Sequence, residues 1–384
     1  MTVKAPTLGR PIGRRTFLSH ATRGVGAVSL SVFASSCRGS SDPDERRRLH
    51  VDNWPAYIDA TEDGHKGSVD RFREATGIDV TYTEGINDNN EYFAKIQPRL
   101  SAGRVIEPDV IVLSNWMAAR LIRLGWMDKL PLENVQNKAN LRDEHKQPNY
   151  DPTGEYSLPW GGVLIGIGYN RKATGRDLGS IDDLFAPDLK GRVGMLTEMR
   201  DTIGMIMLSL GIDPSAVTTF AQAAPAFERL ERAKATGQVR AFTGNDYVDD
   251  LMTGNFAACI AWQGDALQMV KDNPDIRFII PEQGGLTAVD TMLMPKGAPN
   301  REAAAAWMNF VYDPRQGAHI TAANQSVSPV KGVQEELAKF DSEMAANPLL
   351  FPDAATIARL KVFANIDEKV EREYDEAFAK IIGA

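Results

Sequence analysis

The chain has 384 residues, of which 43% are hydrophobic, and this length predicts a packed core divided into two lobes. Five of its 43 basic residues fall within positions 1–36, so 38 basic and 51 acidic residues remain from Cys37 onward, a net charge of −13. Such an acidic chain argues against nucleic acid as a partner, because phosphates need a basic surface. The charge favours a cationic ligand weakly, since acidity also serves solubility.

The first forty residues carry an export pattern. Residues 13–18 read Gly-Arg-Arg-Thr-Phe-Leu, a modestly apolar stretch follows, and small residues then lead into Cys37. This resembles a twin-arginine signal peptide that ends in a lipoprotein box. We therefore expect a signal peptide over 1–36, lipidation of Cys37, a flexible tether over 37–48, and a periplasmic or cell-surface protein held at the membrane by its lipid. Ala34 stands where Leu is commoner, so cleavage with release stays open, as does an ordinary disordered basic terminus.

Short apolar runs alternate with helical patterns from Leu49 onward. The strands and helices expected in this first series are, in order, 49–53, 69–75, 78–82, 90–100, 108–113 and 117–124. Their alternation predicts a mostly parallel sheet, and ligands of such sheets lie beyond the carboxyl ends of the strands. Trp54 and the segment 114–116 fall at such ends. No window of about 18 purely apolar residues occurs, so no transmembrane helix is expected.

A second alternating series begins at Val193. Its expected elements are strands at 193–196, 256–262 and 277–281 and helices at 201–210, 216–235, 301–312 and 367–381. Two long apolar stretches, 156–169 and 289–294, are expected to cross between the lobes. The predicted class is therefore α/β, with discontinuous lobes joined by two crossing segments. The expected division is lobe 1 at 49–163 and 289–336, and lobe 2 at 164–288 and 337–384.

Several short blocks occur in the order found in one known family. The block Asn-Trp-Pro-Ala-Tyr at 53–57 resembles the start of the spermidine/putrescine-binding proteins of polyamine ABC transporters. Further blocks are similar to that family at 75–80, 108–110, 124–127, 158–161, 188–191, 260–262, 281–285 and 351–354. Each block alone is weak evidence for the family, but the order and spacing that the blocks share with it indicate the type II periplasmic-binding-protein fold.

The resemblance implies a solute-binding protein that closes on its ligand by a hinge motion and is not an enzyme. The implied ligand is a polyamine such as spermidine or putrescine, and the implied partners are the permease and ATPase of an ABC importer. We expect a monomer without cofactor or metal. The ligand-binding positions of the family correspond here to Trp54, Tyr57, Ser114, Trp116, Glu198, Asp201, Trp262 and Asp290.

These residue types suit a chain of methylenes that carries ammonium groups. Carboxylates meet ammonium groups through charge-assisted hydrogen bonds, and aromatic faces attract each cation by about 0.5–2 kcal/mol. Asp290 lies in an otherwise apolar stretch, where an unpaired charge is costly. The aromatic candidates can also be core residues, although their places at strand ends favour the site, and Glu198 and Asp201 can simply favour a helix N-terminus. Further candidates beside predicted strands are Asp246, Tyr247 and Asp265.

Three positions depart from the family pattern. Ala288 stands where a second stacking Trp is usual, Ser326 where a Tyr is usual, and Phe363 where a Gln is usual. The loss of one aromatic wall predicts a wider pocket. A bulkier ligand, a monoamine or an amino-acid derivative is therefore a possible alternative to spermidine.

Other functions stay open. A secreted hydrolase lacks support, because no histidine lies in a Gly-x-Ser-x-Gly or His-Glu-x-x-His context and Cys259 lies in an apolar strand. A ferric-ion binder of the same fold lacks the expected adjacent tyrosines and any histidine cluster. A betaine binder, and an adhesion lipoprotein without ligand, are the remaining alternatives.

Overall fold

The structure is a computed structural model, and it describes residues 48–62, 64–146 and 148–383. The expected signal peptide, the expected lipidation site Cys37 and the expected tether up to residue 47 lie outside these residues. Arg48, expected at the end of the tether, is instead the first residue of strand β1.

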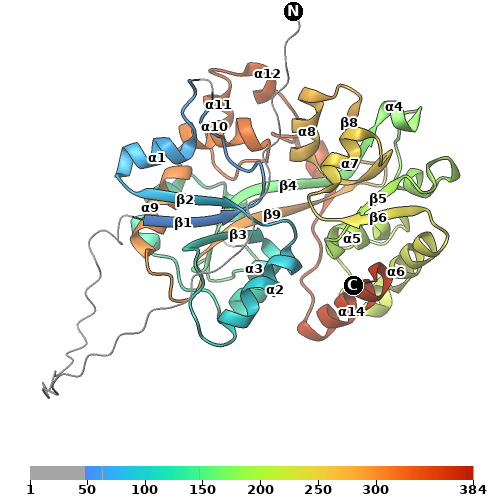
Figure 1. Cartoon of the computed structure of the whole chain (residues 1–384), viewed down its shortest axis with the longest axis horizontal. Helices are drawn as coiled ribbons and strands as arrows, with labels where there is room; N and C mark the ends of the chain where they lie inside the picture. Colours follow the sequence, from blue (N-terminus) through green and yellow to red (C-terminus); the bar gives the residue numbers. More distant parts are fainter. Residues whose placement is uncertain (1–47, 63, 147, 384) are drawn as a thin grey trace, which may run out of the picture. The chain divides into compact units, whose positions relative to one another are not determined.

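Within the described residues, ten strands form one mixed sheet (Figure 1). They are β1 Arg48–Asn53, β2 Asp79–Glu84, β3 Val110–Ser114, β4 Ser157–Asn170, β5 Val193–Leu196, β6 Val239–Thr243, β7 Ala258–Trp262, β8 Ile276–Ile279, β9 Gly285–Leu293 and β10 Leu360–Lys361. The order across the sheet is β2-β1-β3-β9-β4-β7-β5-β6, with β10 beside β9 and β8 beside β4. Strand β1 is parallel to β2 and β3, and β5 is parallel to β6 and β7.

Strands β4 and β9 join the two parallel groups and lie side by side in Figure 1. They are antiparallel to each other, β9 is antiparallel to β3, and β4 is antiparallel to β7. The expectation of a mostly parallel sheet therefore holds within each parallel group. It fails at β4 and β9, the antiparallel strands that connect the two groups. Strand β9 begins at Gly285 rather than at the expected residue 289, because Gly285 and Leu286 pair with β10.

The helices are α1 Ser68–Thr76, α2 Asn89–Leu100, α3 Asn115–Arg123, α4 Arg171–Thr174, α5 Met199–Ser209, α6 Phe220–Ala235, α7 Tyr247–Thr253, α8 Gln263–Asp272, α9 Arg301–Val311, α10 Pro314–Asn324, α11 Val333–Leu337, α12 Ser342–Ala345, α13 Ala354–Ala358 and α14 Glu368–Ile382. Helix α6 begins later than expected, because Gln222 accepts a hydrogen bond from the backbone N–H of Thr219 and so fixes the first turn. Helix α2 begins where Asp88 accepts from two backbone N–H groups of the first turn. The hydrophobic pattern does not single out α7, α8 or α10.

The buried hydrophobic side chains form two separate clusters. In the first, Trp307 packs edge-on against Phe72, with ring centroids 5.2 Å apart. In the second, Tyr374 of α14 packs against Phe227 of α6, at 5.3 Å. The segment 337–384 was expected in lobe 2, but Leu337 and Ala345 lie in the first cluster, because α11 packs on α10 and α12.

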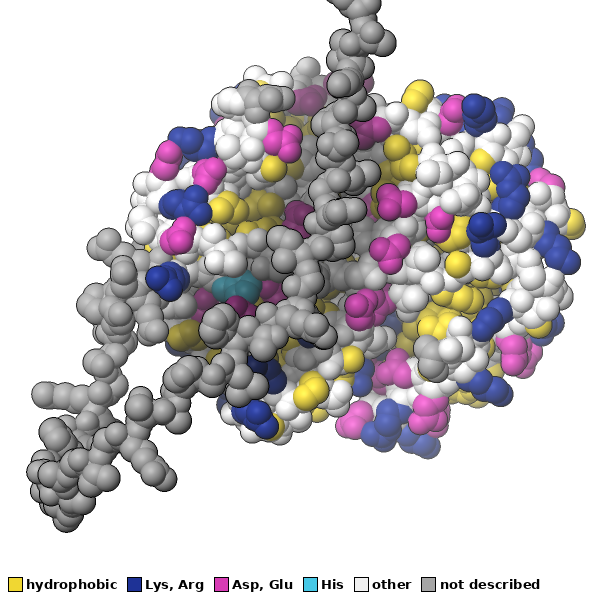
Figure 2. Space-filling model, in the orientation of Figure 1, with side chains coloured by type: hydrophobic (Ala, Val, Ile, Leu, Met, Phe, Trp, Pro, Cys, Tyr) yellow, Lys and Arg dark blue, Asp and Glu magenta, His cyan; other side chains and the backbone are white. Residues whose placement is uncertain are grey.

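The surface is mixed in charge. Acidic side chains gather near the middle of the face drawn in Figure 2, and most basic side chains on that face lie toward its edges. Such a distribution raises the local concentration of cations. Across the described part of the chain, no helix combines the length and apolarity needed to span a bilayer.

The packing between β4 and β8 can be tested by a substitution at Gly166 of β4. A Cβ at this position would overlap the backbone carbonyl oxygen of Ile279. Because backbone cannot yield without loss of strand pairing, we expect Gly166→Ala to lower the free energy of unfolding by about 1–3 kcal/mol in a denaturant titration. Gly179 is the matched control, since a Cβ there meets nothing within 4 Å. Gly179→Ala should change the value by less than about 0.5 kcal/mol, and equal effects would contradict the packing described.

Candidate functional site

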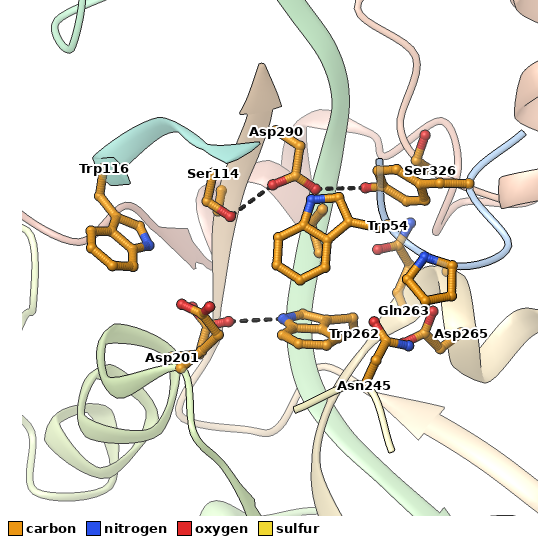
Figure 3. Close-up of a pocket in the computed structure, with 16 residues that line it drawn as sticks. Trp54, Ser114, Trp116, Asp201, Asn245, Trp262, Gln263, Asp265, Asp290 and Ser326 are labelled. Carbon is orange, nitrogen blue, oxygen red and sulfur yellow. Dashed lines mark hydrogen bonds between the residues drawn. The ribbon is translucent and has the colours of Figure 1, made fainter. Parts of the chain in front are cut away.

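A cavity lies where the carboxyl ends of strands from both parallel groups meet (Figure 3). Its empty volume is about 620 Å³, counting its open mouth. Each sequence-predicted ligand residue lines it: Trp54, Tyr57, Ser114, Trp116, Glu198, Asp201, Trp262 and Asp290. The rings of Trp54, Tyr57 and Trp116 pack in or against the first hydrophobic cluster, and that of Trp262 against the second. The cavity therefore lies between the two cores.

The turn after β1 places two of the aromatic side chains. Asn53 is fully buried, and its Oδ1 accepts a hydrogen bond from the backbone N–H of Trp54 (2.8 Å). Ala56 then adopts a left-handed backbone conformation with a φ of 52°. Residues other than glycine rarely adopt this conformation, and the tight turn brings Tyr57 back toward the end of the sheet.

Asp290 is the central carboxylate of the cavity. It lies on β9, opposite Ser114 of β3 and Gly161 of β4. Its Oδ1 accepts a hydrogen bond from Ser114 Oγ, and its Oδ2 accepts one from the Tyr57 hydroxyl, both at 2.8 Å (Figure 3). The residue is 6% exposed, and burial raises the pKa of the carboxyl although these two hydrogen bonds oppose the shift. Within the described residues, Asp290 forms no ion pair.

Asp201 is a second carboxylate, at the start of α5. Its Oδ2 accepts a hydrogen bond from Trp262 Nε1 at 2.8 Å (Figure 3). The Trp262 ring packs edge-on against Trp54, with centroids 6.2 Å apart and planes at 64°. Burial raises the pKa of Asp201 to about 7, and the charge of Asp290 adds to the shift against the Trp262 hydrogen bond. The carboxylate and the indole therefore fix each other at one side of the cavity.

Asp265 is a third carboxylate, in the first turn of α8. Its Oδ2 accepts a hydrogen bond from the hydroxyl of the buried Tyr247 (2.7 Å). Burial raises the pKa of Asp265 to about 6, with a further contribution from the charge of Asp290. The Tyr247 ring also packs against Trp262, at a centroid distance of 5.8 Å. Asp246 is exposed and is not among the residues that line this cavity.

Glu198 lines the cavity but is already engaged across it. Its Oε1 accepts hydrogen bonds from the backbone N–H (2.9 Å) and the side-chain amide (2.8 Å) of Asn89, at the start of α2. The same amide donates to Ser114 Oγ (3.0 Å), which donates to Asp290. Glu198 is 3% exposed, and burial raises its pKa well above the ordinary value, together with the charges of neighbouring acids. We interpret Glu198 as a bridge between the two sides of the cavity.

Trp116 stands at the far end of the cavity. The Arg200 guanidinium covers one face of its ring, with Cζ 4.0 Å from the centroid. The three departures from the family pattern lie in different places. Ala288 and Ser326 line the cavity, whereas Phe363 lines a neighbouring one.

Two residues in or next to the cavity lining could not be recognised from the sequence, namely Gln263, which lines the cavity, and Asn89, which lies behind the lining. Asn89 is completely buried and links Glu198 to Ser114. Gln263 accepts a hydrogen bond from the backbone N–H of Leu164 (2.8 Å) and so ties α8 to β4. These amides lie at helix starts, where Asn and Gln are too common to mark a site.

The composition of the lining decides what the cavity can hold. Among the described residues that line it there are four carboxyl groups and no Lys, Arg or His side chain. Within the same described ranges, no group of three or more His, Cys, Asp and Glu side chains is placed to hold a metal ion. Carboxylates buried without a cationic partner raise one another's pKa, and a ligand cation removes that cost. The cavity is therefore chemically suited to an organic cation.

Comparison with known proteins identifies the family. A family model described as bacterial extracellular solute-binding protein matches residues 67–352. This chain belongs to the bacterial extracellular solute-binding proteins. The putrescine-binding periplasmic protein PotF of Escherichia coli strain K12 is 26% identical over 380 residues, 92% of this chain and 94% of that protein. SpuD of Pseudomonas aeruginosa strain UCBPP-PA14, also a putrescine-binding periplasmic protein, is 28% identical over 369 residues, 91% of this chain and 96% of that protein.

A solved structure shares the fold. The putative spermidine/putrescine ABC transporter protein from Listeria monocytogenes has a TM-score of 0.75 at 23% identity, and the match covers 87% of this chain and 98% of that chain. The type II periplasmic-binding-protein fold predicted from the sequence is thereby confirmed, and so is the resemblance to the polyamine-binding family.

The hydrogen bonds from Asn89 to Glu198 in this solute-binding protein can be tested without ligand. Glu198→Gln keeps an Oε1 that accepts both hydrogen bonds of Asn89, whereas Glu198→Ala leaves two buried donors without a partner. We expect the Ala variant to lower the free energy of unfolding by about 1–3 kcal/mol and the Gln variant by less than about 0.5 kcal/mol, measured by denaturant titration near neutral pH. Similar losses in both variants would show that Glu198 acts as a charge instead.

Proposed function

We propose that this solute-binding protein captures a polyamine-like organic cation outside the cytoplasm and delivers it to the permease and ATPase of an ABC importer. The observation that carries the proposal is the lining of the cavity. The carboxyl groups of Asp201, Asp265 and Asp290 line it, and no basic side chain of the described residues does. An ammonium group bound among them would stabilise their ionised form through charge-assisted hydrogen bonds. The names of the relatives, which are putrescine-binding proteins, support this class of ligand.

The aromatic walls favour an organic cation over a bare metal ion. The rings of Trp54 and Trp262 form two inclined faces beside the carboxylates. Such faces cover methylene groups and attract ammonium groups. A hard metal ion prefers a shell of oxygen ligands and gains nothing from indole rings. Carboxylates combined with indoles therefore match an alkyl chain that carries amines.

The crossing strands support a hinged cleft. We take the two hydrophobic clusters as the two lobes, with β4 and β9 as the segments that connect them. Opening of the lobes would break the hydrogen bonds from Asn89 to Glu198 and from Thr197 to Asp88 (2.6 Å). A ligand that contacts Asp290 and Asp201 at once would favour the closed arrangement, because it binds that state better.

The sequence supports export and a membrane anchor. The twin-arginine pattern at 13–18 and the small residues before Cys37 are the grounds for a cleaved signal peptide and a lipidated N-terminus. The periplasmic relatives agree with export. Such an anchor would keep a monomeric binding protein close to its transporter.

Asp290→Asn is the direct test of the cation site. The variant keeps the shape of the side chain and removes its charge. We expect the dissociation constants for putrescine and spermidine, measured by titration calorimetry, to rise by the equivalent of about 2–5 kcal/mol. Asp246→Asn is the matched control, since it removes the same charge from an exposed residue outside the cavity lining. Equal affinities in the two variants would remove Asp290 from the site, and no binding of either amine by the wild type would reject the proposed ligand class.

Binding should depend on pH. In the free protein the pKa is about 7 for Asp201 and about 6 for Asp265, and an ammonium group binds their ionised forms. Protonation therefore competes with the ligand below these values, so affinity should rise on the order of ten- to a hundredfold between about pH 5.5 and about pH 8. Calorimetry in buffers of different ionisation enthalpy should detect proton release on binding near pH 6.

The pH dependence has its own control. Asp201→Asn keeps an oxygen that accepts from Trp262 Nε1 and has no carboxyl group to titrate, so the affinity of this variant should change less steeply with pH. A profile as steep as that of the wild type would assign the dependence to other groups.

A further inference from the structure

A second cavity adjoins the first. Its empty volume is about 1070 Å³, counting open solvent, and it shares Trp116, Asp201 and Ala288 with the first cavity. Trp116 and Asp201 lie at the side of Figure 3 away from Ser326 and Asp265. The two cavities therefore meet at this end, and Ala288 is the smallest side chain of the shared set.

Ala288 controls this passage by its place on β9. It lies two residues before Asp290, so the two side chains point to the same face of the strand. A ligand with an ammonium group at Asp290 can thus extend along this face past Ala288. A large ring at residue 288 would stand between the two cavities, whereas a methyl group leaves the passage open.

The second cavity, unlike the first, is lined by basic as well as acidic side chains. Arg123 and Arg200 both line it and share one carboxylate, Glu371. Arg123 Nη2 lies 2.7 Å from Glu371 Oε2, and Arg200 Nη2 lies 3.0 Å from Oε1. The nearby Asp375 is 3.6 Å from Arg120 and does not line this cavity. Apart from the shared Asp201, the lining therefore carries one positive charge in excess.

Most N–H donors of the Arg200 side chain have no hydrogen-bond partner among the described residues. The residue is 7% exposed, and among the residues that the structure describes its side chain donates one hydrogen bond, to Glu371. Its guanidinium plane lies against the ring of Trp116. A guanidinium has five N–H donors, and a buried one with most of them unused gains from a carboxylate placed edge-on to it. The unused donors belong to a side chain that lines the second cavity.

We infer that the ligand of this protein carries a carboxylate in addition to its ammonium group. The ammonium group lies at Asp290 in the first cavity, the chain passes Ala288, and the carboxylate meets Arg200 in the second cavity. This inference rests on the proposed function and narrows its ligand class to amines extended by an acidic tail, such as a diamine acylated at one nitrogen by a dicarboxylic acid.

A matched pair of ligands tests this. N-succinylputrescine has one ammonium group and a terminal carboxylate, and N-butanoylputrescine has a similar length without the carboxylate. On the full mature chain, calorimetry should give a dissociation constant about tenfold or more lower for the succinyl compound. Arg200→Gln should reduce this ratio to below about threefold, and because the ratio is taken within one variant, a general loss of packing around Trp116 cancels.

The passage is tested separately. Ala288→Trp, or Ala288→Phe if the first variant does not fold, should lower the affinity for both acylated ligands by about tenfold relative to the affinity for putrescine measured on the same variant. Equal affinity of the two acylated ligands for the wild type, or a ratio that persists in Arg200→Gln, would overturn the inference. Binding of putrescine or spermidine without binding of either acylated ligand would overturn it and leave the proposed function standing. Failure of every amine would reject both.

Discussion

The structure is organised around carboxyl groups that are buried without a cationic partner. Asp201, Asp265 and Asp290 face one cavity, and burial raises the pKa of each of them. The charge of Asp290 adds to the shifts of Asp201 and Asp265. A protein that folds with such groups forgoes stability in its empty state. A cation that binds among these carboxylates would remove the unfavourable free energy of burying them unpaired. That free energy would therefore contribute to the affinity for the cation. The hydroxyl and indole donors around these groups hold them in place without neutralising them.

The crossing strands explain why these groups can meet. In an open α/β sheet, side chains gather beyond the carboxyl ends of parallel strands. Here two parallel groups are joined by the antiparallel strands β4 and β9, so the carboxyl ends of both groups lie around one gap. Asp290 lies on a connecting strand itself, and its contacts with Ser114 and Tyr57 come from the first group. Asp290 would therefore keep its place if the two groups moved relative to each other, as proposed above.

Much of this arrangement could be predicted from the sequence. Strand and helix periodicity indicated the two α/β series, and the resemblance to the polyamine-binding family implied which side chains line the cavity. The ends of predicted strands supported Trp54 and Trp116 in addition, since the end of a strand is fixed by local pattern. Asn89 could not be predicted, because an amide at a helix start has an ordinary capping role and becomes a bridge only through the distant Glu198. The packing of Leu337 with the first cluster likewise depends on α10, a helix that the hydrophobic pattern does not reveal.

Binding and closure share one chain of hydrogen bonds. Asp290 is linked through Ser114 and Asn89 to Glu198, which lies on the other side of the cavity. A ligand shifts an equilibrium only by its different affinity for the two states. In an open state Glu198 and Asn89 would be hydrated, and a cation would meet carboxylates from one side alone. The proposed closure would add the remaining carboxylates and remove water at the same time, which would strengthen each charge-assisted hydrogen bond. A neutral solute of the same shape would gain little from that step, so in the proposed function selectivity for cations would arise largely from closure itself.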